Sequence, residues 1–183
     1  MAIEVNELTL LLKAFQFAAV KHNGQTRKGA DKLPYIVHPI AVARILSSEA
    51  AITDNELICS ALLHDTVEDT HATAEEIEDN FGSEIREIVM DVTDDKALPK
   101  EERKLKQVEH AAHACDKAKL VKLADKISNL RDIQSTPPEG WSTERKQEYF
   151  DWAKKVIDRV RGVNPTLEGI FDAEYLKRPA SEG

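Results

Sequence analysis

Apolar residues recur along most of the chain at intervals of three and four, the spacing that gives an α-helix one hydrophobic face. The first such stretch contains Leu8, Leu12 and Phe15 and ends ahead of Gly24, which predicts a helix over about 6–22. Strict alternation of apolar and polar residues never extends beyond a few positions. The pattern therefore predicts an all-α fold.

Start signals place several of the following helices. Pro39 is expected to open the second helix, because proline is favoured at a first helical position. Thr53 with Glu56, and Thr73 with Glu76, have the spacing of a capping box ahead of an apolar run. We therefore expect one helix to begin after Thr53 and another after Thr73.

Stop signals and turns divide the second half of the chain. Gly82 is expected to end one helix, and a break before Lys100 separates the next helix from a charged one. A strongly apolar helix covers residues 120–130 and ends at the proline-rich turn 136–140. A long helix follows and stops at Gly162. We expect one domain over residues 1–183, with a core over about 6–162 and a short C-terminal helix and tail over 163–183, because 183 residues is the length of one ordinary domain.

The charge balance excludes some partners. The chain carries 25 basic and 33 acidic side chains, a formal net charge of −8, so it has no overall positive field for a nucleic-acid polymer or an anionic membrane. An anionic ligand would need a local basic site. Apolar runs are too short to span a bilayer, and the N-terminus lacks the basic region of a signal peptide. We therefore expect a cytoplasmic protein, with Cys59 and Cys115 as reduced thiols.

An acidic cluster follows an apolar segment in the middle of the chain. On one helix, His64, Asp65, Glu68 and Asp69 would lie along a single edge, since they are three or four residues apart. Carboxylates held this close repel one another unless a cation lies among them. The cluster is therefore expected either to be a solvated helix end or to bind a metal ion.

Two further residues favour the metal. His38 lies at a helix start in apolar surroundings, and Asp125 lies inside the most apolar helix. Taken singly, His38 could be a structural histidine, and Asp125 could pair with Lys122. Together with His64 and Asp65 they supply two nitrogen and two carboxylate ligands. That mixture suits Mn²⁺ or another octahedral divalent ion, whereas zinc prefers tetrahedral nitrogen and sulfur sites.

The segment from residue 21 to residue 32 is basic and lies next to two of these candidate ligand regions. Arg27 offers a planar fork for phosphate oxygens, and Lys28 offers a point charge. A solvated surface loop is the alternative. The other histidines lie in polar stretches and are expected at the surface, namely His22, His71, His110 and His113.

The ordered motifs of this chain resemble the HD superfamily of metal phosphohydrolases, and within it the hydrolase domain of the RelA/SpoT family. The similarity is greatest to its stand-alone small alarmone hydrolases, including the metazoan SpoT homologue. It runs from about Leu8 to about Gly162 and is carried by Arg27 to Gly29, Pro34 to Pro39, His64 to Thr70, Val92 to Lys96 and Leu123 to Arg131. The resemblance implies a single helical HD domain.

The resemblance also implies a reaction and its residues. Such enzymes remove the 3′-pyrophosphate of ppGpp and pppGpp with Mn²⁺, giving GDP or GTP and pyrophosphate. Carried over to this chain, Glu68 and Asp69 position and deprotonate the water, and His38, His64, Asp65 and Asp125 hold the metal. The implied substrate contacts are Arg27, Lys28, Tyr35, Lys100, Asn129, Arg145 and Tyr149.

Two alternatives stay open. Metazoan members of the family are also associated with removal of the 2′-phosphate of NADPH, which the same metal site could perform. A catalytically silent alarmone-binding module is the second alternative, although neither the four candidate ligands nor the Glu68–Asp69 pair is missing here. At 183 residues the chain has no room for the synthetase region of the long family members, so we expect it to degrade alarmone without making it.

Overall fold

The computed structural model describes residues 6–180, which form helices and connecting loops without a β-strand; two isolated β-bridges join loop residues. The predicted all-α class is confirmed. The elements in chain order are α1 (Glu7–Lys21), α2 (Val37–Arg44), the π-helical turn η1 (Ile45–Glu49), α3 (Asn55–Leu63), α4 (Thr66–Asp69), α5 (Ala74–Phe81), α6 (Ser83–Val92), α7 (Lys100–Ala111), α8 (Asp116–Ser135), α9 (Thr143–Ile157) and α10 (Pro165–Tyr175).

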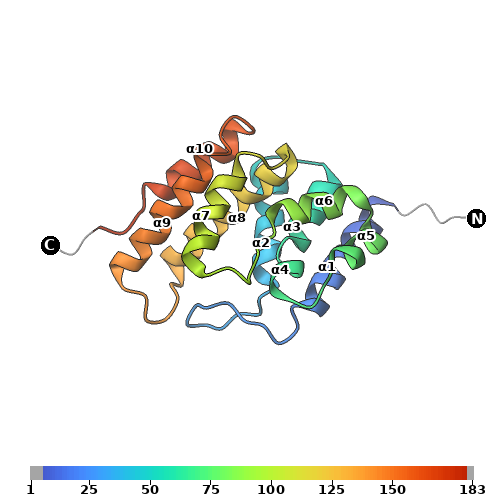
Figure 1. Ribbon diagram of the computed structural model, residues 1–183, viewed down its shortest axis with the longest axis horizontal. Helices are drawn as coiled ribbons and strands as arrows, with labels where there is room; N and C mark the ends of the chain where they lie inside the picture. Colours follow the sequence, from blue (N-terminus) through green and yellow to red (C-terminus); the bar gives the residue numbers. More distant parts are fainter. Residues whose placement is uncertain (1–5, 181–183) are drawn as a thin grey trace, which may run out of the picture.

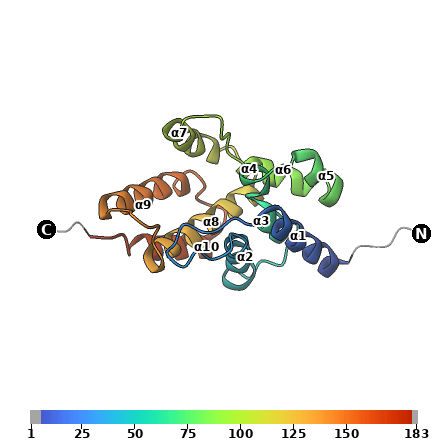
Figure 2. The same cartoon turned by 90° about the horizontal axis from the view of Figure 1, so that it is seen from below.

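Helices α3 and α8 form the centre of the molecule (Figure 1). Helix α3 is packed against α1, α2 and α6, and α8 against α2, α6, α9 and α10. Every side chain from Leu57 to Leu63 is buried, as are most of those of α8 between Val121 and Leu130. Helix α7 is much less enclosed, since Ala111 is its one buried residue. It lies across from α9, apart from the α1–α5–α6 end (Figure 2).

Side-chain caps fix several of the helix starts. The Thr73–Glu76 capping box forms as predicted, and Gly82 ends α5 with a φ of 88°, a conformation that favours glycine. The start predicted at Thr53 is shifted by one residue, because the Asp54 carboxylate accepts the Leu57 N–H at 3.1 Å.

Two other boundaries differ from the prediction and matter for the site. Helix α2 begins at Val37, two residues before Pro39, which places His38 inside its first turn. Helix α3 ends at Leu63, and the chain turns through His64 and Asp65 before α4 begins. The acidic cluster therefore does not lie along the edge of one continuous helix. In the part of the chain between residues 6 and 180, no helix is long and apolar enough to cross a membrane.

Candidate functional site

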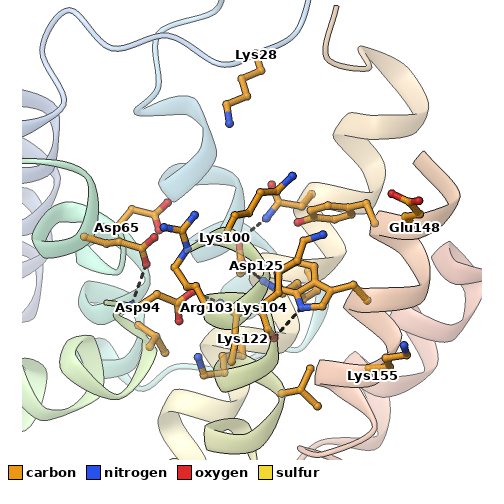
Figure 3. A pocket seen from close by; sticks show the side chains of 18 of the residues that line it. Lys28, Asp65, Asp94, Lys100, Arg103, Lys104, Lys122, Asp125, Glu148 and Lys155 are labelled. Carbon is orange, nitrogen blue, oxygen red and sulfur yellow. Dashed lines mark hydrogen bonds and ion pairs between the residues drawn. The ribbon is translucent and has the colours of Figure 1, made fainter. Parts of the chain in front are cut away.

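A large cavity of about 1070 Å³ lies where α4, α7, α8 and α9 face one another. Figure 3 shows its walls, with Asp125 near the centre, Asp65 to its left and lysines on several sides. All thirteen residues singled out by sequence line this cavity. They are Arg27, Lys28, Tyr35, His38, His64, Asp65, Glu68, Asp69, Lys100, Asp125, Asn129, Arg145 and Tyr149.

Ligand atoms of His38, His64 and Asp65 all lie within 4.8 Å of one another at the floor of the cavity, and Asp125 adjoins the two imidazoles. His38 Nε2 lies 3.1 Å from Asp125 Oδ1 and 3.6 Å from Asp65 Oδ2. His64 Nε2 lies 3.1 Å from Asp65 Oδ2 and 3.9 Å from Asp125 Oδ1. Adjacent ligands of a small octahedral ion are about 3 Å apart, because each lies roughly 2.1 Å from the ion. The separations between these side chains therefore fit a shared divalent ion.

Contacts behind the imidazoles orient both rings. His64 Nδ1 lies 2.8 Å from the Ala61 carbonyl oxygen, and His38 Nδ1 lies 3.2 Å from Ser128 Oγ. A proton on the Nδ1 atom of His64 leaves the Nε2 lone pair free to bind a metal, the usual arrangement of metal-binding histidines. His64 Nε2 is buried and, apart from its 3.1 Å ion-pair contact with Asp65 Oδ2, has no hydrogen-bond partner among the residues the structure describes. An ion at the floor would satisfy that atom.

The electrostatics of the floor also favour a cation. The neighbouring imidazoles and the Lys126 ammonium hold the pKa values of Asp65 and Asp125 well below the ordinary carboxyl value, despite their burial. The same two carboxylates raise the pKa of His64 to about 9, against its burial, which lowers it. Burial dominates at His38 and lowers its pKa. The two carboxylates thus favour positive charge at the point where all four side chains meet.

Glu68 and Asp69 lie beside this floor on α4 but outside the convergent set. Glu68 Oε2 accepts the Asp94 N–H at 3.0 Å, and its other oxygen lies 3.9 Å from Lys96 Nζ. Burial, reinforced by Asp94 and Asp65, raises the pKa of Glu68. Asp69 pairs with Lys96. Two carboxylates that differ in surroundings therefore adjoin the floor, and the one with the raised pKa is suited to accept a proton.

Tyr35 connects this pair to the floor. Its hydroxyl lies 2.7 Å from Asp65 Oδ2 and 3.1 Å from Asp69 Oδ2, so it can donate to either carboxylate. His22 stacks on the Tyr35 ring with centroids 4.8 Å apart. The surface position predicted for His22 is wrong, because the ring lies at the C-cap of α1 and is packed under Tyr35, with 3% exposure. His71, His110 and His113 are exposed as predicted.

The predicted substrate-contact residues lie along the upper walls. Arg27 donates to Asn129 Oδ1 at 3.0 Å, is paired with Asp132, and lies over the Tyr35 ring. The Arg145 guanidinium covers the Trp141 ring at 4.6 Å. Lys28, Lys100 and Arg145 are exposed, whereas Tyr149 is half-buried between two tryptophans.

Two buried lysines of α8 were not among the residues predicted for the site. Lys126 Nζ lies 2.9 Å from Asp125 Oδ2 and 4.5 Å from the centre of the Trp152 ring. The alternative pairing of Asp125 with Lys122 does not form, and the lysine bonded to Asp125 is Lys126. Lys122 itself lines the cavity and is 6% exposed. Charge alone could not identify either lysine, because the chain has many exposed ones.

The family of the chain follows from its similarity to known protein families. Residues 14–152 match the model described as "HD domain". The chain belongs to the HD domain family.

HD-family relatives match over nearly the full length. The chain is 57% identical over 171 residues to guanosine-3′,5′-bis(diphosphate) 3′-pyrophosphohydrolase MESH1 of Xenopus tropicalis, covering 93% of this chain and 96% of the relative. The Drosophila melanogaster protein of the same name is 50% identical over 167 residues, covering 91% of this chain and 93% of the relative. A solved structure described as a metazoan ortholog of SpoT that hydrolyses ppGpp and plays a role in starvation responses aligns with a TM-score of 0.90 and 49% identity. That alignment covers 92% of this chain and 95% of the other.

Proposed function

We propose that this HD-domain protein is a metal-dependent hydrolase that removes the 3′-pyrophosphate of ppGpp and pppGpp, giving GDP or GTP and pyrophosphate. The observation that carries the proposal is that the imidazoles of His38 and His64 each lie 3.1–3.9 Å from the carboxylates of Asp65 and Asp125, beside Glu68 in one cavity. The names of the full-length relatives support the substrate. We infer one domain over residues 1–183 that acts in the cytoplasm and needs no nucleic-acid or membrane partner.

Mn²⁺ is the ion we propose for the floor. Its preference for mixed nitrogen and carboxylate ligands matches two imidazoles and two carboxylates, held by His38, His64, Asp65 and Asp125. When bound, the ion would screen the negative charge of the phosphate and make a nearby water more acidic. Two neighbouring side chains orient two of these ligands, since Ser128 contacts His38 and Lys126 donates to Asp125.

The chain's own residues supply the proton transfer. In our proposal Glu68 accepts a proton from the attacking water, and Asp69 holds that water in line with the phosphorus atom. The Asp94 N–H fixes one Glu68 oxygen and leaves the other free to face the cavity. Tyr35, which reaches both Asp65 and Asp69, fixes the distance between the water-holding carboxylate and the metal floor.

The walls provide the positive charge that a substrate with several phosphates needs. We propose that Arg27, Lys28, Lys100 and Arg145 contact the phosphates and the base, and that Tyr149 and Asn129 complete the nucleoside pocket. Arg27 is pre-positioned by Asn129 and Asp132, so its planar face can stack against a base while its N–H groups stay bonded. This local charge explains how a chain of net charge −8 could hold a polyanion.

The test compares two substrates on one metal-stripped preparation. Release of pyrophosphate from ppGpp and of phosphate from NADPH is measured before and after Mn²⁺ is added back. Pyrophosphate that appears only with the ion is the expected result. Phosphate from NADPH without pyrophosphate from ppGpp would assign the site to a 2′-phosphatase. Tight ppGpp binding with neither product would make the protein an alarmone-binding module.

A further inference from the structure

Lys122 is a buried cation in the wall of the cavity. It lies on α8 three residues before Asp125, a spacing that puts the two side chains on the same face of the helix. The residue is 6% exposed, and Figure 3 shows it at the deep side of the cavity, below Lys104 and Arg103. Lys122 therefore belongs to the cavity that contains the metal floor rather than to the outer surface.

The Lys122 ammonium is not bonded to another residue of the described chain, residues 6–180. Between residues 6 and 180, its Nζ atom makes neither a hydrogen bond nor an ion pair, and the acids nearest to it act only at longer range. Those acids are already engaged, since Glu68 accepts the Asp94 N–H and Asp94 Oδ2 accepts from the Gln107 amide. Lys126, by contrast, is bonded to Asp125.

Burying an ammonium costs free energy, and Lys122 Nζ, which is not among the fully buried unpartnered atoms between residues 6 and 180, reduces that cost by opening on the cavity. Burial lowers the pKa of Lys122, which reflects that cost. The open side of the group is the cavity, because the helix lies behind it and hydrophobic side chains such as Val121 and Val108 line the wall beside it. The ammonium is therefore placed to bind an anion that enters the cavity next to the metal floor.

We propose that Lys122 binds the terminal phosphate of the substrate's 3′-diphosphate, which makes it a specificity-determining residue for diphosphates over monophosphates. The proposal rests on the proposed hydrolase function. In that reaction the water oxygen bonds to the phosphorus attached to the ribose 3′-oxygen. The bond from that phosphorus to the 3′-oxygen breaks, and the 3′-oxygen takes up a proton. The terminal phosphate keeps its bond to the attacked phosphorus throughout and leaves within pyrophosphate, so Lys122 recognises the length of the phosphate chain.

The test uses two nucleotides that differ only in that phosphate. We would measure kcat/KM of Lys122→Met for ppGpp, and the competitive inhibition constant of guanosine 5′-diphosphate 3′-monophosphate. Loss of one charge-assisted hydrogen bond predicts a fall of about 10- to 100-fold in kcat/KM. The inhibition constant of the monophosphate should change less than about twofold. A parallel change in both quantities, or no change in either, would overturn the proposal.

Lys119→Met is the matched control. This lysine is on the same helix, is paired with Asp116 at 3.2 Å and does not line the cavity, so its removal should leave both quantities unchanged. Thermal unfolding gives an independent readout. Lys122→Met should unfold at the same or a higher temperature than the parent, because an unpaired charge leaves the interior. A lower unfolding temperature would indicate a structural role. If the parent protein releases no pyrophosphate from ppGpp, the proposed hydrolase function is wrong. If the parent is active and Lys122→Met behaves like it, only the role of Lys122 is wrong.

Discussion

Replacement of Glu68 by glutamine separates proton transfer from metal binding. The amide keeps the length of the side chain, and its carbonyl oxygen can still accept the Asp94 N–H, which is 3.0 Å from Glu68 Oε2. The variant loses the ability to take a proton. A general base contributes about 10²- to 10⁴-fold, so kcat of Glu68→Gln should fall by that factor, or about 2.7–5.4 kcal/mol in the barrier.

The same substitution should not weaken the fold. Burial raises the pKa of Glu68, so the folded protein binds this proton more tightly than the unfolded chain does. A raised carboxyl pKa adds stability at low pH, and this is lost as the pH rises through the shifted value. At pH 7 the ionised group therefore costs stability, and a neutral amide removes that cost. Glu68→Gln should unfold in urea at the parent concentration or slightly above it.

A pH profile of kcat with saturating Mn²⁺ completes the assay. In the parent, kcat should fall toward acid with a midpoint above 4.5, the ordinary pKa of a glutamate, because a protonated Glu68 cannot act as a base. In Glu68→Gln, kcat should not show this fall toward acid pH, while the variant binds as much Mn²⁺ as the parent. Parent-like kcat would refute the assignment of Glu68 as the base. Loss of Mn²⁺ would place Glu68 among the ligands instead.

Three other perturbations address the metal floor and the packing of α10. Asp65→Ala should abolish Mn²⁺ retention and turnover together, measured by metal analysis and pyrophosphate release, and a fully active variant would contradict the four-ligand site. Removal of the metal by a chelator should lower the unfolding temperature. Adding Mn²⁺ at 100 times its dissociation constant should then raise the free energy of unfolding by about 2.7 kcal/mol. An unchanged unfolding temperature would show that the ion does not bind the folded state. Arg131→Met should lower the free energy of unfolding by about 1–3 kcal/mol at pH 7, because the Arg131 guanidinium donates to both Glu49 oxygens and to Glu174. These bonds lower the pKa values of both glutamates, so the loss of unfolding free energy, measured by urea denaturation, should become smaller as the pH falls below about 4. An equal loss at pH 7 and at low pH would show that Arg131 stabilises the fold by packing alone.

Local sequence signals predicted much of the helical framework. Thr73 and Glu76 form the expected capping box, Asn164 caps α10 as its side chain accepts the Leu167 N–H, and the charged helix α7 begins at Lys100. These features depend on residues three or four positions apart, so they can be inferred without a tertiary structure. Asp54 was missed in favour of Thr53 because both residue types cap helices, and only the backbone conformation distinguishes them.

The turn between α3 and α4 shows the limit of such inference. Helical spacing indicated that His64, Asp65 and Glu68 would share an edge, and they do line one cavity. The chain achieves this differently, by ending α3 at Leu63 and turning at Asp65. The turn brings His64 Nε2 within 3.1 Å of its neighbour's carboxylate. A pattern of residue types identifies which groups gather, while tertiary packing decides the backbone that brings them together.

Burial was the least predictable property. His22 lies in a polar stretch, and Lys122 lies in the strongly apolar segment 120–130 but is of a residue type that is usually exposed. The structure buries His22 under Tyr35, and Lys122 in the cavity wall. His22 is covered by Tyr35 from the loop before α2, and Lys122 faces a cavity that residues of α4, α7 and α9 also line. Residue type alone cannot predict such contacts, because three of the six histidines are buried and three are exposed, and the lysines range from exposed to buried.

The charges around the floor explain why an ion and an anionic substrate would bind in order. Four carboxylates face three ammonium groups there: Asp65, Glu68, Asp69 and Asp125 against Lys96, Lys122 and Lys126. These carboxylates also hold a proton on His64, whose pKa they raise to about 9, and a divalent cation would take the place of that proton. Once a divalent ion is bound, the net charge of the floor becomes positive, and the basic side chains of the cavity walls add to this positive charge. Phosphate affinity should therefore depend on prior metal binding, and ppGpp should bind metal-free protein much more weakly than the Mn²⁺ form.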